Sequence, residues 1–71
     1  MNLTEFHGTK LKRTRNAIGY SQKQLAELSG VSLRSIQMYE QRQKDINKAQ
    51  SDSLYRLAKV LGCTMEDLLE E

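Results

Sequence analysis

The sequence contains few of the residues that form disulfides, metal sites or catalytic pairs. It has one cysteine, Cys63, and one histidine, His7, among 71 residues. One cysteine cannot form an internal disulfide, and the cysteine and histidine do not stand at the spacing of a metal site. Neither has a recognisable base or ligand beside it in the sequence. We therefore expect no enzyme activity, no metal and no cofactor, and we interpret Cys63 as a small packing residue.

Long apolar runs are absent as well, and no charged segment followed by an apolar one opens the chain. Membrane insertion and secretion have no support, so we expect a soluble protein in the reducing cytoplasm. A chain of 71 residues is enough for one small domain that buries roughly 60% of its unfolded surface. Such a core leaves little room for a pocket that encloses a small-molecule ligand. We expect a function carried out by a contact surface.

Charge is distributed unevenly along the chain. The formal net charge is +2, but residues 1–48 hold nine Lys and Arg against four Asp and Glu, a net charge of +5. Residues 49–71 hold two basic residues against five acidic ones, a net charge of −3. This asymmetry suits a domain that places one face against phosphates and leaves its other end facing solvent or a partner.

Residues 21–41, SQKQLAELSGVSLRSIQMYEQ, have the pattern of two short helices joined by a tight turn. Ser21 is a good N-cap for a helix that begins near residue 22, and Gly30 follows the helix as a left-handed stop. The apolar residues of this first helix share one face: Leu25, Ala26 and Leu28.

The second helix of this stretch starts after Ser32, a second N-cap, while Val31 gives the turn an apolar side chain. Ile36 and Tyr39 repeat at helical spacing on the inner side. The opposite side of the helix carries Leu33, Arg34, Gln37, Met38 and Gln41. The sequence therefore predicts a helix with one face directed into the protein and one directed outward.

The spacing of these residues resembles that of a known family. The pattern is SQxxLA, three residues, GVS, three residues, Ile and, after three more residues, Glu. It resembles the Cro and phage-repressor type of helix-turn-helix protein, the Xre family, over about residues 11–69. The resemblance implies an all-α fold, a compact five-helix lambda-repressor-like domain with the helix-turn-helix at its second and third helices. The residues that carry the pattern are Ser21, Gln22, Leu25, Ala26, Gly30, Val31, Ser32, Ile36 and Glu40.

The resemblance also implies sequence-specific binding of double-stranded DNA in transcriptional regulation, with the third helix, about residues 32–41, inserted into the major groove. In the family, the N-terminal half and outer face of this helix reach base edges, which here implies Ser32, Leu33, Arg34, Gln37 and Met38. Phosphate contact is implied for Gln22, with neighbouring donors Lys23, Arg42 and Lys44.

Two arginines have competing interpretations. In the family, an arginine four residues before the glycine pairs with a glutamate at the end of the recognition helix, and Arg15 and Glu40 stand at those positions. A structural ion pair is therefore favoured over a phosphate contact for Arg15. Arg34 is the strongest candidate base reader, because bidentate donation to guanine is the commonest specific contact, although a phosphate contact is its alternative.

The helices on either side are predicted from caps and apolar spacing. We expect the first over residues 10–17, or from Thr9, with residues 1–8 as a frayed end of a single domain over residues 1–71. Because Arg42 stands where the family commonly has glycine, the third helix is expected to run on by one or two residues. The apolar or partly apolar residues expected along the buried side of the first helix are Leu11, Thr14, Arg15 and Ile18.

The C-terminal part is expected to form the last two helices. Asn47 is predicted to be the N-cap of the fourth, with Gln50 completing a capping box. Thr64 is predicted to cap a short fifth helix. The residues expected to face the core from these helices are Leu54, Leu57, Ala58, Leu61, Leu68 and Leu69.

Both the function and the oligomeric state have alternative interpretations. We expect a repressor that binds as a homodimer, because a dimer reads two half-sites about 34 Å apart. The candidate dimer surface is formed by Met65, Leu68 and Leu69, whose alternative role is closure of the core. Leu33 and Met38 cannot hydrogen-bond a base, although either can touch a thymine methyl group. A protein-interaction module that uses this Leu33/Met38 face, such as an antitoxin or a regulator's partner, is therefore the alternative function.

Overall fold

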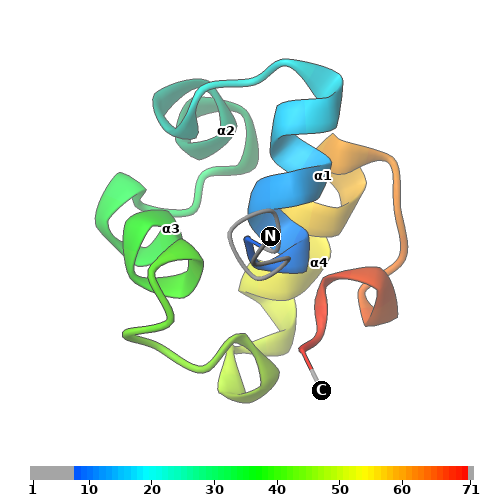
Figure 1. The fold of residues 1–71 in the computed structure, drawn as a ribbon. Helices are drawn as coiled ribbons and strands as arrows, with labels where there is room; N and C mark the ends of the chain where they lie inside the picture. Colours follow the sequence, from blue (N-terminus) through cyan, green and yellow to red (C-terminus); the bar gives the residue numbers. More distant parts are fainter. Residues whose placement is uncertain (1–7, 71) are drawn as a thin grey trace, which may run out of the picture.

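The computed structural model describes residues 8–70. Over this range the chain forms four α-helices and two short 3₁₀ turns, with no β-strand. The α-helices are α1 (Lys10–Ile18), α2 (Gln22–Ser29), α3 (Leu33–Glu40) and α4 (Ser51–Leu61), and the 3₁₀ turns are η2 (Ile46–Lys48) and η3 (Glu66–Leu68) (Figure 1). The predicted all-α class is confirmed. The predictions for His7 and the start of the chain lie outside the described residues.

The core takes one fully buried side chain from nearly every element. Leu11 of α1, Leu25 of α2, Ile36 of α3, Leu57 of α4 and Leu68 of η3 are each fully buried. Figure 1 shows α1 and α4 together at the centre, with α2 and α3 on one side and η3 on the other. Because every element contributes to one small core, each fixes the position of its neighbours.

Two residues expected on buried faces are exposed. Ile18 retains 45% and Leu28 57% of its accessible surface. Each lies in the last turn of its helix, before the left-handed Gly19 or Gly30. The apolar side of each helix therefore extends past the part that the other elements cover.

The prediction of a fifth α-helix is wrong. Only one 3₁₀ turn, η3, forms there, and its N-cap is Met65 in place of the predicted Thr64. Thr64 instead exchanges two hydrogen bonds with Asp67: its Oγ1 accepts from the N–H of Asp67, and its own N–H donates to Asp67 Oδ2. Leu69 already has extended backbone angles, so the chain leaves the turn at once. Leu68 is fully buried beneath α1 and α4, which means that it closes the core and is not available to a dimer surface.

The segment between α3 and α4 also differs from the sequence prediction. Helix α3 ends at Glu40, because Arg42 itself takes the left-handed conformation, with φ of 60°, in place of the glycine common in the family. Asn47 does not cap α4: it lies inside η2, which Asp45 caps by accepting from the N–H of Asn47 at 2.9 Å. The N-cap of α4 is Gln50, without a side-chain hydrogen bond.

Candidate nucleic-acid interface

The α2–turn–α3 unit is fixed by hydrogen bonds between near neighbours. Ser21 and Gln24 form a capping box at the start of α2, in which each side chain accepts from the other's main-chain N–H. Gly30, with φ of 75°, donates its N–H to Ala26 at the end of the helix. Ser32 then caps α3 by accepting from the N–H of Ser35 at 3.1 Å. The predicted start and stop of α2 and the predicted start of α3 are thus confirmed.

Helix α3 has one buried and one open face. Ile36 is fully buried, and Tyr39 is 7% exposed. On the other face Arg34 and Leu33 are exposed, while Gln37 and Met38 are half-buried. Ser32 is exposed at the N-terminal end. The residues expected to meet bases therefore lie together on the outer side and first turns of one helix.

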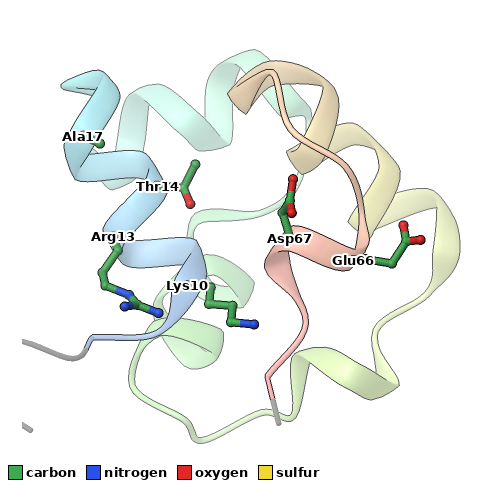
Figure 2. Close-up of a pocket in the computed structure, with 6 residues that line it drawn as sticks. All are labelled: Lys10, Arg13, Thr14, Ala17, Glu66 and Asp67. Carbon is green, nitrogen blue, oxygen red and sulfur yellow. The ribbon is translucent and has the colours of Figure 1, made fainter.

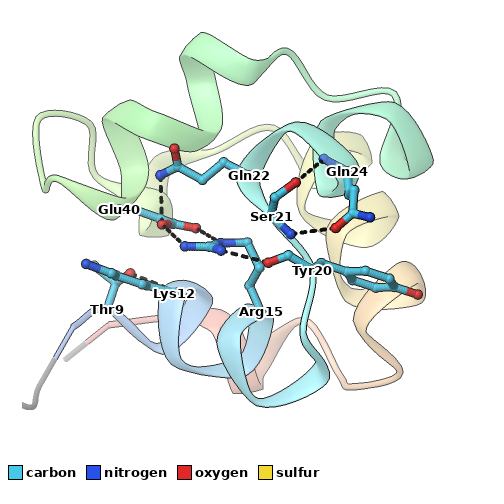
Figure 3. Close-up of polar contacts among 8 residues, drawn as sticks. All are labelled: Thr9, Lys12, Arg15, Tyr20, Ser21, Gln22, Gln24 and Glu40. Carbon is cyan, nitrogen blue, oxygen red and sulfur yellow. Dashed lines mark hydrogen bonds and ion pairs between the residues drawn. The ribbon is translucent and has the colours of Figure 1, made fainter.

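A buried ion pair joins the end of α3 to α1 (Figure 3). Arg15 Nε donates to Glu40 Oε2 at 2.7 Å, and Arg15 Nη2 donates to Glu40 Oε1 at 2.9 Å. Arg15 Nη1 also donates to the main-chain oxygen of Tyr20 at 2.8 Å. The hydrogen bond to Glu40 raises the pKa of Arg15 above its ordinary value, although burial opposes this. Both charges are satisfied, and α3 is held against α1 and the α1–α2 connection.

A family model described as helix-turn-helix matches residues 11–68. The chain belongs to the helix-turn-helix family. Its Xre type consists of DNA-binding transcription regulators, so this chain carries the domain of such a regulator and double-stranded DNA is its expected partner. The comparisons with curated proteins and with solved structures gave no match.

Within this helix-turn-helix, the side chain of Gln22 has a partner that the sequence analysis did not predict. Its side-chain Nε2 donates to Glu40 Oε1 at 3.0 Å, so the amide is directed at the buried ion pair (Figure 3). The first-turn main-chain N–H groups of α2 have no intrahelical partner and lie at the positive end of the helix dipole. The bond to Glu40 uses one of the two N–H donors of the Gln22 amide, and Lys23 beside it is exposed, so phosphate contact by Gln22 and Lys23 stays a prediction.

The other two candidate phosphate donors follow α3 and are both exposed. Arg42 Nη2 lies 3.8 Å from Glu70 Oε1, and Lys44 Nζ lies 5.6 Å from the centre of the Tyr39 ring. The contacts of Glu70 with this region were not anticipated from the sequence. Glu70 accepts from the N–H of Lys10 and pairs with the side chain of Asn47, 60 and 23 residues away. No local signal marks partners so far apart.

A shallow groove lies on the other side of α1 from the helix-turn-helix. Figure 2 shows basic side chains of α1 across from acidic ones of η3, and the lining residues are Lys10, Arg13, Thr14, Ala17, Glu66 and Asp67. Two basic and two acidic residues balance each other there, so the groove offers no field of one sign to a phosphate.

Among residues 8–70 no group of three or more His, Cys, Asp or Glu is arranged to hold a metal ion. Partial burial and then the charge of Asp67 raise the pKa of Cys63, which disfavours the reactive thiolate. None of the helices between residues 8 and 70 has the length and apolarity needed to cross a membrane.

Proposed function

We propose that the chain is a sequence-specific double-stranded DNA-binding repressor that inserts α3, about residues 32–41, into the major groove. The observation that carries this proposal is that α3 is held firmly in the fold while its outer face stays open. Its inner side is buried through Ile36, its C-terminal end is held by the Arg15–Glu40 pair, and Arg34 remains exposed. A major groove about 12 Å wide admits one helix, and a helix held at a fixed angle can read bases.

Base recognition is proposed for the outer face of α3. Arg34 is the main reader, through two hydrogen bonds to guanine O6 and N7. Gln37 suits adenine, whose N6 and N7 match a carboxamide. Ser32 adds an adaptable hydroxyl at the helix start, and Leu33 and Met38 offer apolar contact to thymine methyl groups.

Backbone contacts are proposed at both ends of the helix pair. The start of α2 supplies main-chain N–H groups and Lys23, and the loop after α3 supplies Arg42 and Lys44. Such donors fix the register of the protein on DNA without reading sequence. The net charge of +5 over residues 1–48 supports this orientation, because these residues include the whole helix pair.

We also propose that two copies bind together. The candidate contact is reduced to Met65 and Leu69, which are half-buried, because Leu68 is fully buried in the core. Sedimentation measured with and without DNA tests this proposal. A complex that contains one chain per palindromic site would contradict it.

Titration of the protein with DNA at several salt concentrations tests the main proposal. We expect log affinity to fall linearly with log salt as counterions are released, and a sequence-selective fraction to resist competitor DNA. Selection from a random DNA library then identifies the site, and a reporter gene carrying that site should be repressed. Absence of binding at low salt would refute the DNA-binding proposal, whereas activation of the reporter would refute only the repressor role.

An interaction with protein through the Leu33/Met38 face is the second candidate function. The observation that favours it is the exposure of two apolar side chains on either side of the turn in the sequence: Leu33 is 37% exposed and Leu28 57%. An antitoxin or a regulator's partner that uses this face would keep its partner affinity when DNA phosphate donors are removed. Equal loss of both activities in Leu33→Ser would place partner and DNA on one surface.

A further inference from the structure

Asn47 and Glu70 hold each other through two opposed hydrogen bonds. Asn47 Nδ2 donates to the main-chain oxygen of Glu70 at 2.5 Å, and the N–H of Glu70 donates to Asn47 Oδ1 at 2.8 Å. One carboxamide thus pairs with both main-chain groups of a single residue, much as a neighbouring strand would. The Asn47–Glu70 pair joins η2 to the segment after η3.

The carboxylate of Glu70 extends this connection to two more elements. Its Oε2 accepts from the N–H of Lys10 at 2.6 Å, and its Oε1 lies 3.8 Å from Arg42 Nη2. The Lys10 N–H belongs to the first turn of α1, where the helix provides no acceptor and an acidic group is favourable. Residue 70 therefore meets the start of α1, the loop after α3 and η2 at one point.

The loop that meets residue 70 has a strained conformation. Arg42 has a φ of 60°, which is unfavourable for a residue with a Cβ atom. The N–H groups of Gln43 and Lys44 both donate to the main-chain oxygen of Met38, at 2.9 and 3.2 Å, which fixes the first half of the loop to α3. A strained backbone persists only where its surroundings over-determine it. At the other end of the loop, the Asn47–Glu70 pair supplies that restraint.

We propose that Asn47 is a positioning residue for DNA binding. By pairing with Glu70 it holds the loop after α3 in the conformation that keeps Arg42 and Lys44 beside the C-terminal end of α3, where the backbone of a DNA bound to α3 would pass. Asn47 acts through this loop and makes no contact with DNA itself. The inference rests on the proposed function, since it concerns the phosphate donors assigned there.

The test compares Asn47→Ala with the unmodified protein and with Asn16→Ala, which removes an exposed asparagine of α1. A labelled short duplex of mixed sequence is titrated by fluorescence anisotropy at salt concentrations from about 50 to 200 mM. The temperature is one at which circular dichroism shows every variant to be folded. For Asn47→Ala we expect affinity to fall on the order of three- to tenfold, and the slope of log affinity against log salt to decrease by about 1 to 2, because one or two phosphate contacts are lost. Asn16→Ala should match the unmodified protein.

A second variant keeps the test decisive if Asn47→Ala does not fold. Asn47→Ser keeps an uncharged hydrogen-bonding group that is too short to pair with both main-chain groups of Glu70, so its loss of affinity and its decrease in slope should be intermediate. Unchanged affinity and slope in a folded variant, with only a lower midpoint of thermal unfolding, would overturn the proposal and give Asn47 a purely structural role. Failure of the unmodified protein to bind the duplex at the lowest salt is a different result, because it refutes the DNA-binding function on which the inference rests.

Discussion

Gln22 and Glu40 are joined by a hydrogen bond of 3.0 Å from the side-chain Nε2 to Oε1. The same oxygen accepts from Arg15 Nη2 at 2.9 Å, so the start of α2, the end of α3 and the middle of α1 meet at one carboxylate. The side chain of Glu40 is 2% exposed in the ion pair. Removing Gln22, Arg15 or Glu40 should therefore alter the position of the helix pair and lower the stability of the fold.

Gln22→Ala is expected to reduce the free energy of unfolding by about 1.5–3 kcal/mol, because a hydrogen bond to a charged group is lost. The salt slope of DNA binding should stay unchanged, since the amide faces Glu40. The neighbouring Lys23→Ala is the matched control: it should change stability by less than about 0.5 kcal/mol and decrease the slope by about 1. Urea unfolding and DNA titration measure both quantities. A decreased slope with unchanged stability in Gln22→Ala would show that the amide turns to a phosphate.

Truncating one partner of the Arg15–Glu40 ion pair should destabilise the fold more than replacing both partners with apolar residues. Arg15→Ala or Glu40→Ala is expected to cost about 3–5 kcal/mol, because the remaining charge is left buried. The double variant Arg15→Met/Glu40→Met should cost much less than the sum of the two single changes. Urea unfolding of all three variants measures the coupling. If the loss of stability in the double variant equals the sum of the two single losses, the two charges do not stabilise each other in the core.

Arg34→Ala should relax base preference at one position of the selected site. The expected loss of discrimination is about 1–3 kcal/mol there, which is the usual range for a bidentate arginine–guanine contact. Competition between the selected site and its single-base variants measures this. A uniform loss of affinity for every sequence, together with a decreased salt slope, would instead assign Arg34 to a phosphate.

Arg42→Gly and Arg42→Ala separate backbone strain from charge. Both remove the guanidinium, but only glycine adopts the observed φ of 60° without a steric cost. Arg42→Gly should be more stable than Arg42→Ala by about 1 kcal/mol, while both should lose the same amount of DNA affinity. Thermal unfolding and DNA titration test the two parts. Equal stability of the two variants would argue against strain at this residue.

Asp67 should make the fold less stable at acid pH. Hydrogen bonds from Thr64, first from its main-chain N–H, lower the pKa of Asp67, and the nearby charge of Lys10 acts in the same direction. Because the folded-state pKa is below the unfolded value of about 3.9, the stabilisation is complete above that pH and is lost as pH falls through the folded-state pKa. Asp67→Asn should flatten the stability profile in this range. An unchanged profile, measured by urea unfolding, would contradict the assignment.

Much of the fold was predictable where a few adjacent residues decide the outcome. Ser21, Gly30 and Ser32 set the ends of α2 and the start of α3 as expected, because caps act within about four residues. The prediction failed for Asn47, where a cap signal was present but its carboxamide is turned to Glu70. It also failed for the fifth helix, since Leu68 reaches the core from a single 3₁₀ turn.

The sequence by itself determined the helix pair, its family and the residues on the outer face of α3. These follow from spacing and caps, which depend on local backbone geometry. Only the tertiary structure decided that Gln22 turns to Glu40 and that Asn47 pairs with Glu70, at separations of 18 and 23 residues. Such partners are chosen by how the helices pack around the core, because a polar side chain bonds whichever matching group the packing brings within reach.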